Sequence, residues 1–117
     1  GYNIQLDMDN DCIFCKIVAG MIPAQKEYED ELLVAFRDAK PSAPVHVLII
    51  PRAHIPNLES AGEQVDTLGK LQVVISRLAK KLGVQSGYKV SLNAGRFQEV
   101  PHLHYHLMGG WEEGGMK

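Results

Sequence analysis

The chain has 117 residues, of which 45% are hydrophobic, and its formal net charge is −2 at pH 7. This length predicts a single domain with a real hydrophobic core, and the charge excludes the basic excess that proteins need to bind a long nucleic-acid backbone. A local pocket can still hold a small phosphate ligand. No apolar run approaches the roughly 20 residues of a membrane helix, so we expect no membrane partner.

The N-terminal residues 1–11 are expected to be an extension, and 1–7, which precede Met8, are compatible with a remnant of an expression tag. They lack the basic start and the apolar stretch of a signal peptide, so we expect a cytoplasmic protein. In a reducing compartment, the spacing of Cys12 and Cys15 favours half of a metal site or a redox pair over a structural disulfide.

The first half of the chain predicts a short helix followed by three strands. Residues 11–20 have apolar side chains at helical spacing and end on a glycine. Residues 24–30 and 32–38 are typical of two strands joined at an acidic turn. Residues 45–52 are rich in β-branched side chains and apolar on both faces, so this strand is expected at the centre of a sheet.

The second half predicts one long helix and two further strands. The helix is expected from about Ser60 to Leu82, because Ser60 and Glu63 have the spacing of a capping box and a glycine follows. Its predicted buried face consists of Val65, Leu68, Leu71, Ile75, Leu78, Ala79 and Leu82. Residues 87–95 and 102–108 predict the last two strands.

These elements predict an α+β fold. We expect a mainly antiparallel five-stranded sheet with one long helix and a short N-terminal helix. A long alternation of strands and helices, which would indicate a parallel sheet, does not occur in this sequence.

Three of the five histidines, His102, His104 and His106, occupy alternate positions of the last predicted strand. Their rings are therefore expected on one face, with the apolar residues between them facing the core. A merely solvated face would be an uncommon use of three histidines, since such clusters mark metal or catalytic sites. Two interpretations remain: ligands of one metal ion, or neutral imidazoles that act as nucleophile and acid–base groups.

The spacing of the three rings favours two neighbouring centres. Alternate Cβ atoms lie roughly 6.5–7 Å apart along a strand, so three successive rings span about 13 Å. Because metal–nitrogen bonds are only about 2.1 Å long, two rings can converge on one ion, whereas a third would be strained.

The last strand resembles the His-x-His-x-His-x-x pattern that names the histidine triad (HIT) family. The resemblance to the Hint branch of that family extends through successive blocks, namely "CIFCKI", "IPAQKEYED", "LLVAFRD", "PSAPVHVLIIPRAHI", "GYKVSLNAG" and "HLMGG". These blocks stand in the family's order from about Cys12 to Gly110. A HIT-like domain is therefore expected over 12–110, with a tail over 111–117.

The resemblance implies a nucleotide hydrolase or transferase that acts at the α-phosphate of nucleoside phosphoramidates or related adenylated compounds, with a purine nucleotide as substrate. His104 would be the nucleophile and form a covalent nucleotidyl-histidine that water hydrolyses. His106 would contact the α-phosphate. His46 is similar to a fourth family histidine that supports the triad, although by itself it is more typical of a buried core histidine.

The resemblance also implies a nucleotide-binding set, namely Phe14, Ile17, Ile22, Phe36, Asp38, Ala39, Asn93, Gln98, His104 and His106. The apolar members would enclose the base, and Asp38 would hold the ribose hydroxyls. The alternatives are ordinary core packing for the apolar residues and a turn cap before Pro41 for Asp38. Glu99 is expected either to be solvated at the loop edge or, beside a phosphate, to act as a general acid.

A second centre is implied for a metal ion. The Cys12-x-x-Cys15 spacing is common in tetrahedral zinc sites, and the resemblance adds His54 and His102 as ligands. Four protein ligands leave no open position, so we expect one structural Zn²⁺ per chain. The redox alternative for the cysteines lacks a thioredoxin-like βαβ context.

The resemblance further implies a homodimer, with the helix over about 60–82 and the strand over 87–94 near the two-fold axis. Two rival functions stay open at this point. One is a metal-dependent hydrolase with its metal at the three histidines, and the other is a nucleotide-binding protein without catalysis, which the fold alone does not exclude.

Overall fold

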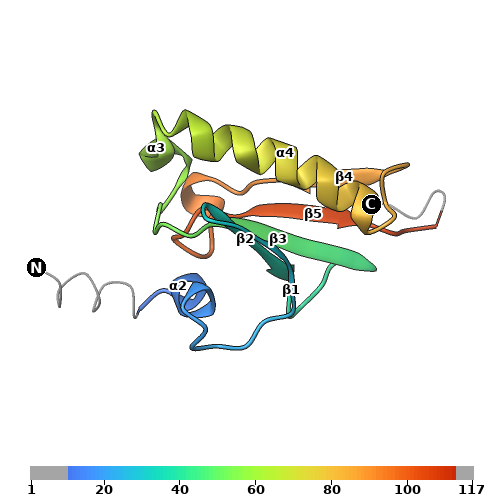
Figure 1. Ribbon diagram of the computed structural model, residues 1–117, viewed down its shortest axis with the longest axis horizontal. Coiled ribbons are helices and arrows are strands. Elements are labelled where there is room, and N and C mark those ends of the chain that lie inside the picture. Colours follow the sequence, from blue (N-terminus) through green and yellow to red (C-terminus); the bar gives the residue numbers. More distant parts are fainter. Residues whose placement is uncertain (1–10, 113–117) are drawn as a thin grey trace, which may run out of the picture.

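A five-stranded antiparallel sheet with the order β1-β2-β3-β5-β4 carries the domain, and a helix covers each face (Figure 1). The computed structural model describes residues 11–112. The strands are β1 (Lys26–Glu29), β2 (Leu33–Arg37), β3 (Val45–Pro51), β4 (Tyr88–Ser91) and β5 (Tyr105–Gly109). The predicted α+β class and five-stranded sheet are confirmed. The predicted extension 1–11 and tail 111–117 lie almost wholly outside the described residues.

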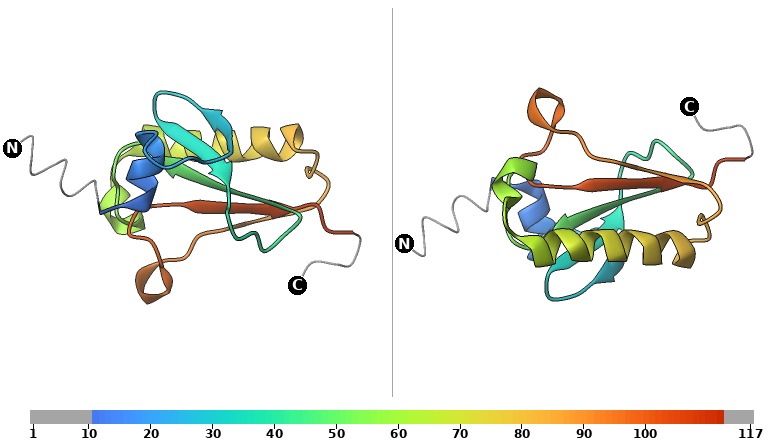
Figure 2. Two further views of the ribbon diagram at one scale, coloured as in Figure 1. Left: turned by 90° about the horizontal axis from the view of Figure 1, so that it is seen from below. Right: turned by 90° about the horizontal axis from the view of Figure 1, so that it is seen from above.

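Within residues 11–112, four helical segments accompany the sheet. They are α2 (Ile13–Val18), α3 (Leu58–Ala61), α4 (Val65–Lys81) and the 3₁₀ turn η1 (Gly95–Phe97). The long helix α4 runs along one face, whereas the segment that contains η1, orange-brown in Figure 2, projects away from the sheet. Among residues 11–112, no helix is long and apolar enough to cross a membrane.

The two central strands, β2 and β3, are buried on both faces, as predicted for β3. Towards α4 they contribute to a core of Leu33, Ala35, Val47, Ile49, Leu71, Val74, Ile75 and Leu78. Towards α2 they contribute to a second core of Val34, Phe36, Leu48, Ile50, Phe14 and Ile17. Each fully buried side chain of this kind stabilises the fold by about 1.5–3 kcal/mol, so both helices are held mainly by packing.

The predicted start of the long helix is wrong. Asn57 caps the short helix α3 by accepting a hydrogen bond from the amide of Ser60 at 2.8 Å. Gly62, with φ 41°, then ends that helix. The long helix α4 therefore begins only at Val65, which is 71% exposed and not part of the buried face. Ser60 and Glu63 had the right spacing for a capping box, but a better cap stands three residues earlier.

The last strand also differs from its prediction, because β5 begins at Tyr105 and not at His102. The amide of Leu103 donates to the carbonyl of Ile55 at 2.7 Å, so the backbone at Leu103 is hydrogen-bonded to the loop after β3 and not to a strand of the sheet. The predicted alternation of side chains nevertheless continues: Leu103 and Leu107 lie in the core under α4. His102 instead contacts Phe14 of α2 on the opposite side.

The end of β5 is closely packed. A Cβ atom added at Gly109 would lie 2.8 Å from Cβ of Val84, in the segment after α4. The next residue, Gly110, has φ 83°, a left-handed conformation that glycine adopts without strain. The absence of a side chain at Gly109 lets β5 approach Val84, just after the end of the long helix.

This contact predicts opposite effects for two Gly→Ala substitutions. Gly109→Ala should lower the free energy of unfolding by about 1–3 kcal/mol, because the new methyl group meets Val84. Gly69→Ala, inside α4 and with nothing within 4 Å of the added Cβ, should raise it by roughly 0.5–1 kcal/mol. Urea unfolding followed by circular dichroism measures both. Two shifts of the same sign would contradict this packing.

Candidate functional site

The strands β3 and β5 bring two histidines together on the face towards α2. His46 pairs with Met108 and Leu48 with His106, so the two histidines are diagonal neighbours in the antiparallel ladder. Their ring centroids are 5.1 Å apart. Diagonal positions are within reach of aromatic side chains, so the register alone makes this contact.

A chain of hydrogen bonds determines where both rings carry their proton. The amide of Ser42 donates to Nδ1 of His46 at 2.9 Å, so in the neutral ring the proton is on Nε2. That Nε2 donates to Nδ1 of His106, also at 2.9 Å, and lies 3.5 Å from Oδ2 of Asp38. The proton of His106 is therefore on Nε2, which is buried and has no hydrogen-bond partner within residues 11–112.

Burial keeps both rings neutral. Desolvation lowers the pKa of His46 and of His106, because it disfavours the charged imidazolium. For His106, the neighbouring rings of His104 and His46 act in the same direction. The carboxylate of Asp38 raises both pKa values and that of Glu99 raises the pKa of His106, but neither outweighs burial.

His104 has the opposite tautomer. Its Nδ1 donates to the main-chain oxygen of His102 at 2.8 Å, and since a carbonyl oxygen only accepts, the proton must be on Nδ1. In the neutral ring, Nε2 then carries a lone pair, and no partner within the described residues occupies it. The ring packs edge-on against Phe14 and His106, with centroids 5.1 and 5.2 Å away.

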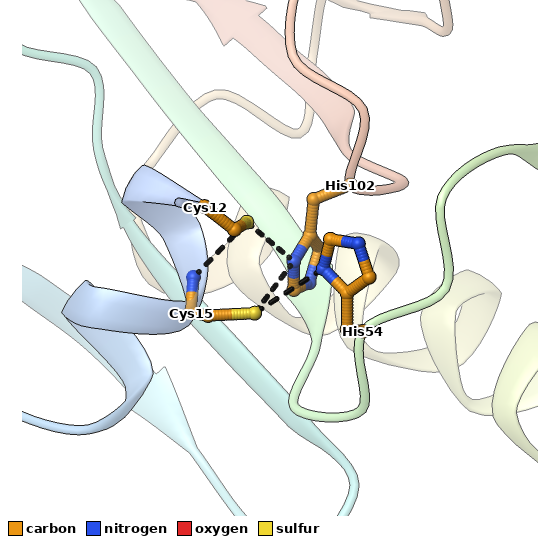
Figure 3. A group of neighbouring side chains, drawn as sticks. All are labelled: Cys12, Cys15, His54 and His102. Atoms are coloured by element: carbon orange, nitrogen blue, oxygen red, sulfur yellow. Dashed lines mark hydrogen bonds between the residues drawn. The ribbon is translucent and has the colours of Figure 1, made fainter. Parts of the chain in front are cut away.

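A second cluster joins α2 to two loops (Figure 3). Cys12 and Cys15 lie at the start of α2, His54 lies in the loop after β3, and His102 precedes β5. Nδ1 of His102 is 3.3 Å from Sγ of Cys12 and 3.6 Å from Sγ of Cys15, and Nδ1 of His54 is 3.2 Å from Sγ of Cys15. The four potential ligand atoms lie within 4.8 Å of one another.

These distances fit a tetrahedral metal site. Zn–S bonds of about 2.3 Å and Zn–N bonds of about 2.1 Å at tetrahedral angles place sulfur and nitrogen about 3.6 Å apart. Nε2 of His102 donates to the carbonyl of Pro51 at 2.8 Å, which leaves the lone pair on Nδ1 facing the thiols. Such a bond to the remote ring nitrogen is typical of metal-binding histidines. Two thiols and two imidazoles are ligands that zinc prefers.

A pocket of about 940 Å³ opens between α2 and the sheet. It is apolar at the end formed by α2 and β2, and it bears the histidines at the other end. Nearly all of the predicted nucleotide-binding residues line it, together with His46: Phe14, Ile17, Ile22, Phe36, Asp38, Ala39, Asn93, His104 and His106. The predicted metal ligands lie outside this lining, so the structure separates the five histidines into two groups.

One predicted residue does not line the pocket. The side-chain amide of Gln98 donates to the carbonyls of Pro56 at 2.6 Å and Val100 at 2.9 Å. It thus ties the loop before the triad to the loop after β3. The neighbouring Glu99 is exposed and lines the pocket.

Several lining residues were not singled out from the sequence. Leu48 and Met108 follow His46 and His106 by two positions on their strands, so the period-two pattern already pointed to them. Ser42 contributes through its main-chain amide, for which the side-chain sequence carries no signal.

Comparisons with known proteins agree with this architecture. The HIT domain family matches residues 19–113. Protein HitA of Neisseria gonorrhoeae is 48% identical over 105 residues, 87% of this chain and 97% of that protein. Purine nucleoside phosphoramidase of Escherichia coli is 40% identical, covering 88% and 90%. A 14 kDa zinc-binding protein of Zea mays is 43% identical, covering 87% and 84%.

Solved structures give the same result. A histidine triad protein from Clostridium difficile has a TM-score of 0.83 and 43% identity, covering 87% of this chain and 92% of that one. A HIT family hydrolase from Legionella pneumophila has a TM-score of 0.82 and 39% identity, covering 86% and 94%. The chain belongs to the histidine triad family, as the sequence motif predicted, and has its nucleotide-processing fold.

The buried neutral rings predict a pH dependence of stability. The pKa values of His46 and His106 are lowered in the fold, so below the ordinary value of 6.5 the unfolded chain binds more protons than the folded chain. The free energy of unfolding should therefore decrease as the pH falls through the window below 6.5. Urea unfolding at a series of pH values measures this, and His46→Gln should flatten the profile. An unchanged slope in that variant would contradict the assignment.

Proposed function

We propose that this chain acts at the α-phosphate of purine nucleoside phosphoramidates or related adenylated compounds, through a covalent nucleotidyl-histidine on His104. The observation that carries the proposal is the 2.8 Å hydrogen bond from Nδ1 of His104 to the main-chain oxygen of His102. It leaves an unprotonated Nε2 beside the pocket, and a nucleophilic imidazole needs that tautomer. The E. coli relative, named for purine nucleoside phosphoramidase activity, supports the choice of substrate.

In the first step, Nε2 of His104 forms a bond to phosphorus while the bond from phosphorus to the leaving amine breaks. The amine takes a proton from solvent at the open rim as it departs. The nucleotidyl-imidazole carries a positive charge, and the carbonyl of His102 stabilises it by accepting from Nδ1. Water then attacks phosphorus and forms a P–O bond while the bond from phosphorus to Nε2 of His104 breaks. One proton of that water stays on the nucleotide phosphate, the other goes to solvent, and His104 returns to its neutral form with its proton on Nδ1.

The other two pocket histidines assist by position. His106 presents a proton on Nε2 to a phosphoryl oxygen, which would satisfy the one buried side-chain donor left without a partner in residues 11–112. His46 keeps His106 in that tautomer through the hydrogen bond to its Nδ1. Such preorganised donors act where negative charge develops in the transition state, so they lower the barrier without reorganising.

The nucleoside would occupy the remainder of the pocket. Its apolar end suits a purine base, with Phe14 and Phe36 in edge contact at 5.5 Å and Ile17 and Ile22 beside them. Oδ1 of Asp38 accepts the amide of Lys40 at 2.8 Å, which orients the carboxylate. Its second oxygen is then available to the ribose hydroxyls. Two further residues, Ala39 and Asn93, complete the proposed binding set at the rim.

For the second cluster we propose one structural Zn²⁺ per chain, held by Cys12, Cys15, His54 and His102. The similarity to the zinc-binding protein of maize and the donor set support it. Because four protein ligands close the shell, the ion would stabilise the fold and not activate water. A metal shared by all three triad histidines is not favoured, since the ring of His102 faces the thiols and Pro51.

We further propose a homodimer in the cytoplasm. β4 is an edge strand, and its Tyr88 and Val90 are 39% and 42% exposed, which suits pairing with a second copy. Two cysteines grouped with two histidines as potential metal ligands, and not paired as a disulfide, are typical of a reducing compartment. Sedimentation analysis should give twice the chain mass, and Val90→Lys should shift it towards the monomer. A monomeric wild-type protein at micromolar concentration would refute the dimer.

The nucleophile can be tested directly. His104→Ala should lower turnover of adenosine phosphoramidate by more than about 10³-fold, because covalent catalysis depends on that one ring. AMP binding should persist in the variant, which serves as its own folding control. In the wild-type protein, a quenched reaction should carry a nucleotidyl mass on His104. Near-normal turnover in the variant would refute the covalent route, and a wild-type protein that binds AMP without any turnover would favour a non-catalytic nucleotide-binding protein.

The metal can be tested by composition. Protein purified without chelators should contain close to one zinc per chain, and Cys12→Ser should lose the zinc and lower Tm, because ligand binding is coupled to folding. Met21→Ser is a matched control on an exposed residue just after α2. Zinc-free wild-type protein with the stability of the zinc-containing protein would refute the structural role.

A further inference from the structure

One short helix takes part in both clusters. Cys12 caps α2 and Cys15 lies within it, so the two thiols stand on a single helical turn. Phe14, which lies between them in sequence, lines the pocket and packs against Phe36. Its ring also packs edge-on against the metal-cluster histidine His102 and the pocket histidine His104, with ring centroids 5.8 and 5.1 Å away.

His102 links the same two clusters through its own atoms. Nδ1 faces the thiols, and Nε2 donates to the carbonyl of Pro51, so the ring has one orientation. The main-chain oxygen of the same residue accepts from Nδ1 of His104. The ring that faces the thiols and the carbonyl that orients the proposed nucleophile therefore belong to one residue.

The helix α2 depends on contacts with the rest of the chain for its place. It has six residues, and isolated helices of that length are not stable in water. The HIT domain match begins at residue 19, so α2 lies ahead of the segment that defines the family. Yet α2 supplies Ile13, Phe14 and Ile17 to the pocket. Part of the pocket lining thus comes from a short segment that is held both by the packing of Phe14 and Ile17 and by the thiol and imidazole cluster.

We propose that Cys12, Cys15, His54 and His102 are positioning residues for the nucleotide site, so that metal binding and nucleotide binding strengthen each other. The inference rests on the proposed nucleotide function and adds a coupling between its two sites. With the metal bound, α2 and the carbonyl of His102 are held in the arrangement that receives the nucleotide. A nucleotide packed against Phe14 holds the same helix in the arrangement that receives the metal.

Coupling of this kind is reciprocal. If zinc raises the affinity for AMP by some factor, AMP must raise the affinity for zinc by the same factor. A metal that only stabilises the folded chain, without any effect on the shape of the pocket, leaves the AMP affinity of folded protein unchanged. The size of this factor in folded protein therefore separates positioning from general stabilisation, and the equality of the two factors checks that both measurements report the same coupling.

The experiment measures both factors on the full chain. Calorimetry gives the Kd of AMP for zinc-loaded protein and for zinc-free protein whose fold is verified by circular dichroism. Competition with a chelator gives the Kd of Zn²⁺ with and without saturating AMP. We expect AMP and Zn²⁺ each to tighten the other by at least about five-fold. A factor of one in a folded zinc-free protein would overturn the proposal.

Cobalt keeps the test decisive if the zinc-free chain unfolds. Co²⁺ in the site absorbs visible light according to its ligand geometry, so AMP added to Co²⁺-loaded protein should shift the absorption bands. Phe14→Leu should reduce the shift and the coupling factor, whereas Phe97→Leu, on an exposed ring outside the pocket lining, should change neither. An unchanged spectrum in the AMP-bound wild-type protein would overturn the coupling alone, whereas loaded protein that binds no AMP would overturn the proposed function as well.

Discussion

The antiparallel pairing of β3 with β5 is the contact on which the site depends. Its register sets His46 diagonally across from His106 and, on the opposite face, places Val47 and Leu107 directly opposite each other in the core under α4. A slip of one residue would turn the histidines into that core and the apolar residues into the pocket. The hydrophobic face towards α4 thus holds the histidine-bearing face in its position.

The segment from His102 to His104 lies just before β5 and is not paired with β3. Because the amide of Leu103 bonds to Ile55 and not to β3, the backbone from His102 to His104 is free of the sheet and can turn one ring to α2 and the other to the pocket. The two rings remain connected through one main-chain carbonyl. A regular strand would have spread three rings over about 13 Å of a single face.

Among the described residues, the pocket lining contains no buried cation without a partner, and its Lys40 is exposed. Arg37 lines the pocket, but its guanidinium is 2.7 Å from the carboxylate of Glu27, and His46 and His106 are held neutral by burial. A phosphate would therefore meet oriented neutral donors. Such donors stabilise charge that develops during a reaction, and they hold an anionic product less tightly than fixed cations would.

The sequence by itself determined the five strands and the two-sided burial of β3, because period-two and helical patterns record burial directly. The family and the assignment of the histidines to two groups followed from the resemblance of its motifs to the HIT family. The sequence misplaced the start of α4, since Asn57 and Gly62 decide that boundary through a cap and a backbone angle that compete with an equally plausible Ser60 cap. Only the tertiary structure decided the tautomers of the three pocket histidines and the engagement of Gln98 with the loop carbonyls. These features depend on main-chain amides and carbonyls brought together from distant segments, and backbone groups are the same at every position of a sequence.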